Sequence, residues 1–287
     1  MAEEIIDGYR LQNLMVTGQT TQVWEVVEVT SHRHFAMKIM LPEKIKFGEL
    51  RRLMFHEASV GKQLAHPNVI KIHAISQNPK NPYYVMEFFP AGSLKIRLIR
   101  KQYDFIKERA ASIFKQAATG MAYINATGWV HRDVKPDNML VNSAGELRLI
   151  DFALAQRVES SSFLSRWLRR RKRLVQGTRS YMSPEQIRGE PLDTRADIYS
   201  FGCSLYELTT YRPPFRGMSN QELLQKHVTE KADTPQIHNP DLTDEFARLV
   251  LQMLAKKREE RPQSFHEVLK VLNTIKVYKS DQAVKKE

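Results

Sequence analysis

Two parts of the sequence hold polar residue types at spacings suited to chemistry. HRDVKPDNML (131–140) gathers imidazole, guanidinium, carboxylate, ammonium and amide groups around Pro136 and ends in an apolar run. A polar cluster between a helix and a strand is a poor core and a good active-site loop. Further along the chain, Asp151 ends the apolar run ELRLI (146–150) and precedes Phe152. A carboxylate at the end of a buried strand costs free energy unless it has a partner.

Two other charges lie where an apolar side chain is expected. Lys38 is inside the strand-like run FAMKIML (35–41), and Glu57 interrupts the apolar stripe of a predicted helix. Because a lone buried charge is very costly, we expect the two to pair with each other or with a ligand. The alternative is a lysine that extends to solvent and a glutamate on a frayed helix.

These polar positions need a scaffold, and the first third of the chain predicts strands with one helix. The β-rich runs lie at 23–29, 35–41 and 83–89. The helix is indicated by a stripe at spacings of three and four residues: Leu50, Leu53, Glu57, Val60 and Leu64. After PAGS (90–93) helices dominate, beginning with a stripe over 110–124 that Gly128 closes. We therefore predict a small β-rich lobe and a larger helical lobe, joined near residue 89.

The composition is that of an ordinary globular protein. The chain has 287 residues, of which 42% are hydrophobic and 26% charged. One cysteine, Cys203, excludes an internal disulfide framework and favours a reducing compartment. The N-terminus lacks a signal-peptide pattern, and no apolar run reaches the roughly 18 residues of a membrane span, so we predict a cytoplasmic location.

The net charge of +12 indicates either affinity for anions or a well-solvated basic surface. We favour the solvated surface, because no zinc-ligand spacing and no nucleic-acid motif accompanies the charge. A nucleic-acid partner is therefore not expected.

An ordered set of motifs now gives these observations a context. The motifs are AMK (36–38), Glu57, HPN (66–68), HRDVKPDN (131–138), DF (151–152), GT (177–178), YMSPE (181–185), DIYSFG (197–202), PPF (213–215) and Arg261. In this order they resemble the eukaryotic-type protein kinases, most closely the bacterial members. The resemblance implies an α+β bilobal kinase-like fold over residues 9–277, with a lobe at 9–88, a lobe at 89–277 and tails at 1–8 and 278–287.

The resemblance also implies ATP and Mg²⁺, and a role for each charged position. Lys38 would hold the α- and β-phosphates of ATP, with Glu57 positioning it. Asp133 would accept the proton of the substrate hydroxyl, and Lys135 would neutralise the γ-phosphate. The metal ligands would be Asn138 and Asp151, whose oxygen atoms suit Mg²⁺.

Nucleotide contacts follow from the same resemblance. Val23, Ala36 and Leu140 would enclose the adenine, although their apolar side chains also fit plain core packing. The backbone of Glu87 and Phe89 would bond the adenine edge, with Met86 behind it. The phosphate-covering loop corresponds to VTGQTTQV (16–23), which contributes Val16 and Gly18.

Two departures from the family pattern leave alternatives open. Ala153 replaces the glycine of the usual DFG, and Val16 and Thr21 replace two loop glycines. The chain could then be a pseudokinase, a nucleotide-binding scaffold, or a basic binding protein on a kinase fold. All five charged or polar catalytic positions remain, and the D-x-K pattern of Asp133 and Lys135 is typical of the serine/threonine class. We therefore favour an active serine/threonine kinase acting on protein hydroxyls.

The segment between Asp151 and Pro184 carries a serine cluster at 160–165 and the basic run RWLRRRKR at 166–173. Arg132 precedes Asp133, and in relatives with this arginine a phosphate on the segment orders the loop. We therefore expect autophosphorylation within 160–165. The basic run either docks an acidic partner or is a solvated loop.

Overall fold

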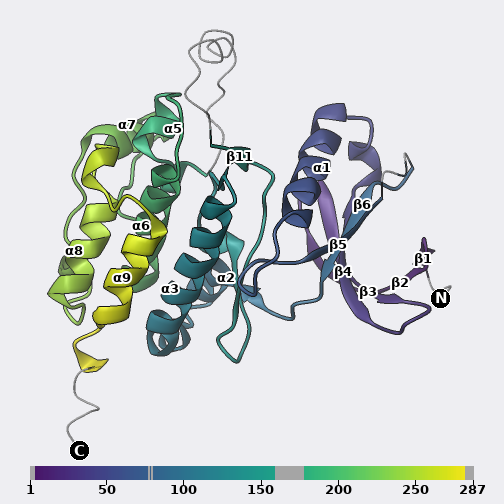
Figure 1. Ribbon diagram of the computed structural model, residues 1–287, viewed down its shortest axis with the longest axis horizontal. Coiled ribbons are helices and arrows are strands. Elements are labelled where there is room, and N and C mark those ends of the chain that lie inside the picture. Colours follow the sequence, from purple (N-terminus) through teal and green to yellow (C-terminus); the bar gives the residue numbers. More distant parts are fainter. Residues whose placement is uncertain (1–3, 77, 79, 159–177, 282–287) are drawn as a thin grey trace, which may run out of the picture. The chain divides into compact units, whose positions relative to one another are not determined.

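The computed structural model of the chain describes residues 4–76, 78, 80–158 and 178–281 (Figure 1). The chain divides into two compact units, Met1–Ala91 with Ile150–Ala153 and Gly92–Leu149 with Leu154–Glu287, which we call unit 1 and unit 2. Unit 1 is rich in strands and unit 2 is mainly helical. The predicted α+β organisation, with a small β-rich lobe and a larger helical lobe, is confirmed.

Unit 1 is built on a six-stranded antiparallel sheet in the order β1-β2-β3-β4-β6-β5. The strands are β1 (Ile5–Ile6), β2 (Tyr9–Thr17), β3 (Thr21–Glu28), β4 (His34–Met40), β5 (Ile72–Ser76) and β6 (Tyr83–Glu87). The runs predicted at 23–29, 35–41 and 83–89 correspond to β3, β4 and β6. Val26, Met37 and Val85 are fully buried in this unit and form the centre of its core.

The long helix of unit 1 is α1 (Gly48–Lys62), and it packs against β5. Gly61 permits the close approach, because a Cβ atom there would lie 2.7 Å from Cγ1 of Ile72. Burial of the helix begins only at Met54. Leu50 is half-buried and Leu53 is 39% exposed, so the N-terminal part of the predicted apolar stripe is not in the core.

Unit 2 consists of helices with two small sheets. The helices are α2 (Leu94–Ile99), α3 (Tyr103–Ala126), α5 (Pro184–Ile187), α6 (Arg195–Thr210), α7 (Asn220–Thr229), α8 (Asp244–Met253) and α9 (Phe265–Thr274). The sheets are β10-β9-β7 (Leu147–Leu149, Met139–Val141, Gly92–Ser93) and β11-β8 (Gln156–Arg157, Trp129–Val130). Short 3-10 helices include Pro136–Asn138 and Arg179–Tyr181.

Two helices organise unit 2. The stripe predicted at 110–124 lies within α3, and Gly128 follows its end with a φ of +83°, a left-handed backbone suited to glycine. Helix α6 is buried along its whole length from Ala196 to Thr210. Both α3 and α8 contact α6, and α9 packs on α3. A helix buried all round is a rigid platform, and its few polar side chains must find partners.

A buried ion pair joins two distant segments of unit 2. The two terminal guanidinium nitrogens of Arg261 donate to the carboxylate of Glu185, at 2.7 and 2.9 Å. The side chain of Arg261 has no exposed area, and that of Glu185 is 4% exposed. The bidentate geometry satisfies both charges where water cannot reach them.

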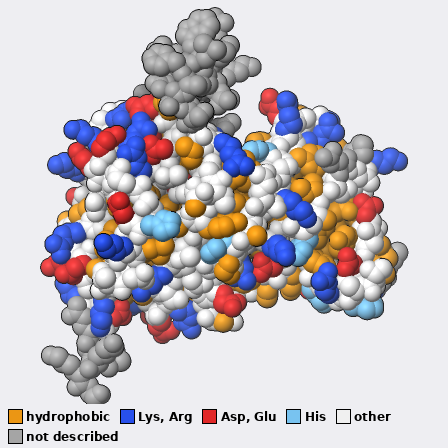
Figure 2. All heavy atoms as spheres, in the orientation of Figure 1, with side chains coloured by type: hydrophobic (Ala, Val, Ile, Leu, Met, Phe, Trp, Pro, Cys, Tyr) orange, Lys and Arg blue, Asp and Glu red, His pale blue; other side chains and the backbone are white. Residues whose placement is uncertain are grey.

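On the face of the molecule in Figure 2, the Lys and Arg side chains lie scattered among Asp and Glu side chains. Among the helices of the described residues, none is long and apolar enough to cross a bilayer.

Candidate active site

One face of the unit 1 sheet carries several predicted nucleotide-binding residues in register. Val16 pairs with Val23, Val23 pairs with Lys38, and Lys38 pairs with Tyr84 across four neighbouring strands. Directly opposed residues of an antiparallel sheet point to the same face. Ala36 lies two positions before Lys38 and is opposed by Met86, so both belong to this face.

Lys38 and Glu57 form the predicted ion pair. The ammonium nitrogen of Lys38 lies 2.9 and 2.7 Å from the two carboxylate oxygens of Glu57. The Glu57 side chain is 6% exposed and that of Lys38 is 21% exposed. Burial by itself lowers the pKa of Lys38, but the charges of Glu57 and Asp151 outweigh it and leave this pKa above its ordinary value. The lysine therefore stays charged, as phosphate binding requires.

Asp151 and Ala153 belong to the same unit as this pair. Asp151 has a φ of +68°, and its Oδ1 accepts a hydrogen bond from the N–H of Ala153 at 3.2 Å. Ala153 is not among the residues with positive φ. Glycine is therefore not required at position 153 for this backbone conformation, and alanine is accommodated without strain. Phe152 is buried, and its ring lies near Gly61 of α1.

The segment matching the phosphate-covering loop is a tight hairpin between β2 and β3. The N–H of Gly18 donates to the carbonyl oxygen of Thr21 at 2.9 Å, which closes the turn. A Cβ atom at Gly18 would lie 3.3 Å from that same oxygen. The tight turn thus explains why glycine stands at position 18. Val16, near the end of β2, is 55% exposed.

In unit 2, the side chains of Asp133 and Lys135 both form hydrogen bonds with Thr178. The ammonium of Lys135 lies 2.5 Å from Oδ2 of Asp133 and 2.6 Å from the hydroxyl oxygen of Thr178. Oδ1 of Asp133 accepts from both the hydroxyl and the backbone N–H of Thr178, at 3.0 and 3.1 Å. Burial raises the pKa of Asp133, but Lys135 outweighs it, so the net pKa lies below the ordinary value and the group is a carboxylate.

Buried polar groups hold the segment before Asp133 in place. The carboxylate of Asp197, fully buried on α6, accepts from the backbone N–H groups of His131 and Arg132, both at 2.9 Å. Asn125, at the end of α3, donates to the same carboxylate at 3.0 Å. The segment before Asp133 is thereby fixed to both central helices.

Asn138 offers a free oxygen for a cation. Its amide nitrogen donates to the backbone oxygen of Asp133 at 2.8 Å and to Oδ2 of Asp133 at 3.2 Å. These bonds fix the amide orientation and leave Oδ1 without a hydrogen bond among the described residues. Oδ2 of Asp151 likewise accepts no hydrogen bond from the residues that the structure describes. Carboxylate and amide oxygens are ligands that suit Mg²⁺, but the two residues belong to different units, so their metal role stays a prediction.

The remaining predicted nucleotide contacts are divided between the units. The N–H of Glu87 donates to the carbonyl oxygen of Lys71 at 2.8 Å, so it is used within the sheet. Phe89 is 7% exposed beyond the end of β6. Leu140 lies in unit 2, where it pairs with Ser93 and Arg148. Asn138 also belongs to unit 2, whereas Asp151 belongs to unit 1.

One hydrogen-bond network in unit 2, next to the segment that begins at Thr178, was missed by sequence reasoning. Glu207 of α6 is 6% exposed, accepts from Lys95 at 2.7 Å and also accepts from the hydroxyl of Tyr181. Tyr181 lies on the segment that begins at Thr178, so the network fixes that segment to α6. An acid inside the apolar run SLYELTT was the available signal.

The predicted autophosphorylation cluster at 160–165 and the basic run at 166–173 lie outside the described residues.

Similarity to known proteins extends over most of the chain. The sequence model of the protein kinase domain matches residues 9–272. The chain is 30% identical over 264 residues to a probable serine/threonine-protein kinase of Streptomyces coelicolor, a match covering 91% of this chain and 38% of that protein. It is 31% identical over 261 residues to the DNA damage-responsive serine/threonine-protein kinase RqkA of Deinococcus radiodurans, covering 89% and 38%. It is 29% identical over 267 residues to serine/threonine-protein kinase PknB of Mycobacterium tuberculosis, covering 91% and 42%.

The chain therefore spans 38% to 42% of the length of these three relatives. The family match covers nearly all of the chain, and its ordered motifs fold into the units described above. The chain belongs to the protein kinase domain family.

Proposed function

We propose that the protein is an ATP-dependent serine/threonine protein kinase that transfers the γ-phosphoryl group of ATP to a Ser or Thr hydroxyl of a protein. The observation that carries the proposal is the hydroxyl of Thr178 held by Asp133 at 3.0 Å beside the ammonium of Lys135. The threonine hydroxyl is hydrogen-bonded to a carboxylate that can accept its proton. A substrate hydroxyl needs the same partners.

In the proposed reaction the acceptor oxygen forms a bond to the γ-phosphorus, and the bond from that phosphorus to the bridging oxygen of ADP breaks. Asp133 orients the hydroxyl and takes its proton. Lys135 offsets the negative charge on the transferred group. The low pKa of Asp133 suits an orienting base that receives the proton late.

Unit 1 supplies most of the nucleotide contacts in this proposal. Lys38, held by Glu57, binds the α- and β-phosphates as a point charge. Val23 and Ala36, with Leu140 of unit 2, enclose the adenine, and Val16 and Gly18 lie on the loop over the phosphates. The backbone at Glu87 and Phe89 bonds the adenine edge, through groups other than the N–H of Glu87.

The family implies ATP and, typically, Mg²⁺. We propose that Asn138 and Asp151 hold the ion, which when bound supplies charge neutralisation on the phosphates. Asp133 fixes the amide of Asn138 through the bond at 2.8 Å, so its oxygen is pre-oriented.

A scaffold without transfer finds no support in the residues. The five positions Lys38, Glu57, Asp133, Asn138 and Asp151 are all present, and the alanine at 153 lies in a backbone conformation open to any residue. The relatives are named serine/threonine kinases, and the D-x-K spacing of Asp133 and Lys135 agrees with that class.

Radiolabelled ATP tests the proposal directly. The purified chain is incubated with γ-labelled ATP, Mg²⁺ and a generic basic protein, and the labelled amino acid is identified. We expect label on serine or threonine, and none after chelation of Mg²⁺. Binding of ATP with Mg²⁺ but no label in either protein would establish the scaffold instead.

We further propose a kinase domain over residues 9–277 in a cytoplasmic location. The location rests on Cys203, which is a buried free thiol rather than half of a disulfide. An acidic partner for residues 166–173 remains a proposal from the sequence alone. Cell fractionation tests the location, and pull-down with acidic peptides tests the partner.

A further inference from the structure

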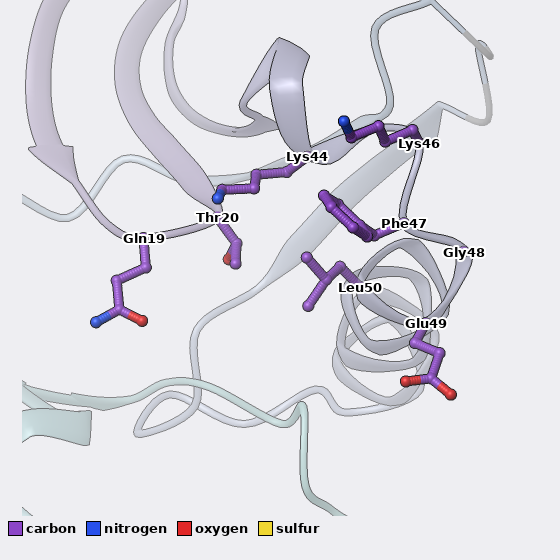
Figure 3. Close-up of a pocket in the computed structure, with 8 residues that line it drawn as sticks. All are labelled: Gln19, Thr20, Lys44, Lys46, Phe47, Gly48, Glu49 and Leu50. Carbon is purple, nitrogen blue, oxygen red and sulfur yellow. The ribbon is translucent and has the colours of Figure 1, made fainter.

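A cavity of about 620 Å³ lies in unit 1 between the tip of the β2–β3 hairpin and the start of α1 (Figure 3). Its lining includes Thr20 from the hairpin and, from the approach to α1, Lys44, Lys46, Phe47, Gly48 and Leu50. Lys44, Lys46, Phe47, Gly48 and Leu50 have no role in the proposed phosphoryl transfer, and Thr20, on the loop over the phosphates, is given no contact in it. The volume is within the range that binds ligands or large side chains.

The apolar wall of the cavity is incompletely packed. Phe47 is 47% exposed, and it lies beside Leu50 in the view of Figure 3. Phe47 is also the N-cap residue of α1 and makes no side-chain capping bond. The first residues of α1 bury no side chain, because the buried positions begin at Met54. An apolar side chain of suitable size would therefore find open contact area here.

The charged wall of the cavity carries two lysines and one glutamate. Lys44 and Lys46 form no ion pair within the part of the chain that the structure describes, and the ammonium of Lys46 lies 5.3 Å from the ring centre of Phe47. Glu49 is the acidic residue of the lining, and in Figure 3 its carboxylate points away from both lysines. The cavity is thus complementary to negative charge.

A second hollow continues this surface. It has a volume of about 410 Å³ and is lined by Gly48, Arg51, Arg52 and Phe55. Gly48 lines both hollows, so they adjoin, and the second repeats the combination of an aromatic ring with cations. An occupant that runs along the start of α1 can meet both.

We propose that these two hollows are a docking site for an acidic peptide segment of a partner protein, carrying a large apolar side chain between its carboxylates. The apolar side chain packs on Phe47 and Leu50, and the carboxylates face Lys44 and Lys46. A free phosphate would leave the apolar walls in water, and a flat lipid surface would not enter a concave site. An extended segment satisfies both walls and the continuity of the two hollows.

Binding can be measured without any phosphoryl transfer, which keeps this inference independent of the proposed function. The probe is a fluorescein-labelled peptide with central phenylalanine and leucine residues flanked by glutamates, titrated with the full chain by anisotropy. A peptide with serines at the two apolar positions and a short RNA oligonucleotide serve as competitors.

Three variants locate the site. Lys44→Glu and Lys46→Glu reverse its charge, and each is expected to weaken binding by about five-fold, since an exposed ion pair contributes up to about 1 kcal/mol. Gly48→Met places a long side chain in the cavity and is expected to abolish peptide binding. The fold should tolerate this change, because a Cβ atom at Gly48 meets no heavy atom within 4 Å. Lys80→Glu, an exposed position of unit 1, is the matched control with the same net charge.

Loss of affinity in all three variants and not in the control supports the site, as does amide-exchange protection of residues 48–53 on peptide binding. Equal weakening by Lys80→Glu would reduce the effect to net charge and overturn the proposal. Binding of the serine peptide or the RNA with the same affinity at the same residues would also overturn it. So would the absence of any binding by the phenylalanine peptide.

Discussion

At the scale of single residues, the two oxygens of Asp133 have separate partners. Oδ1 accepts from the hydroxyl and N–H of Thr178, and Oδ2 lies against Lys135 and Asn138. The carboxylate is therefore oriented before any substrate binds. Its hydrogen bond from the hydroxyl of Thr178, at 3.0 Å, has the donor type of the proposed substrate hydroxyl.

Asp133→Asn should lower the rate of phosphoryl transfer by about 10²- to 10⁴-fold, because it removes the proton acceptor. The affinity for ATP should change little, since Asp133 has no proposed phosphate contact. Transfer of labelled phosphate gives the first quantity and calorimetric titration with Mg²⁺ and ATP the second. A parallel loss of ATP affinity would contradict the role assigned to Asp133.

Lys38→Met should reduce the free energy of unfolding by about 3–5 kcal/mol, because it leaves the carboxylate of Glu57 buried without its partner. The double variant Lys38→Met with Glu57→Leu removes both charges and should recover most of that loss. Urea unfolding of the two single variants and the double variant measures the coupling. Additive losses would show that the two charges do not depend on each other.

The pairing of Lys38 with Glu57 could be predicted from the sequence, because each charge interrupts an apolar pattern and burial forces pairing. The contact of Thr178 with Asp133 could not, since two motifs far apart in the chain give no distance. The backbone angle at Ala153 could not be predicted either, and it is not one of the positive φ values that favour glycine. A motif names the usual residue, whereas the backbone angle decides whether that residue is needed.

At the scale of elements, hydrophobic periodicity predicts that α1 is a helix but not how far each end of it is buried. The stripe at three- and four-residue spacing predicted the helix, and its C-terminal half is buried as expected. Leu50 and Leu53 fit the same stripe but stay partly exposed, because periodicity describes the helix surface and not what lies against it. The strand ends differ by up to two residues for the same reason, since pairing partners set them.

Gly61→Ala should destabilise the protein by about 1–3 kcal/mol, since the added Cβ would lie 2.7 Å from Ile72 and 3.3 Å from the ring of Phe152. Helix propensity alone predicts the opposite, a gain of up to about 1 kcal/mol. Thermal unfolding decides between them. Ser59→Ala, at an exposed position of the same helix, is the control and should shift stability by less than about 0.5 kcal/mol.

At the scale of the whole molecule, both units bury ionisable groups, and stability must therefore depend on pH. His227 of α7 is the clearest case. Its Nδ1 lies 3.0 Å from the hydroxyl of Tyr199, and its Nε2 is buried with no hydrogen-bond partner in the described part of the chain. The ring of Phe215 packs on it at 4.8 Å between ring centres. Burial, with a smaller contribution from Lys256, lowers the pKa of His227 to about 3.

Between pH 6.5 and about 3, the unfolded chain binds a proton at His227 that the folded chain does not. Stability should therefore fall as the pH drops through this window, by up to about 1.4 kcal/mol per pH unit from this residue. His227→Gln cannot titrate, so its unfolding free energy should depend less steeply on pH. Identical slopes for the two proteins in urea titrations at several pH values would contradict the assignment.

The buried pair of Glu185 and Arg261 constrains how the protein can be made. The two residues are 76 positions apart, and a ribosome adding about 5–20 residues per second needs roughly 4–15 s to pass from one to the other. During that interval Glu185 has no cation to accompany it into the interior, so the nascent chain must keep this carboxylate in water. Unit 2 can close only after Arg261 has emerged, and until then the apolar side of α6 is open to chaperones and proteases.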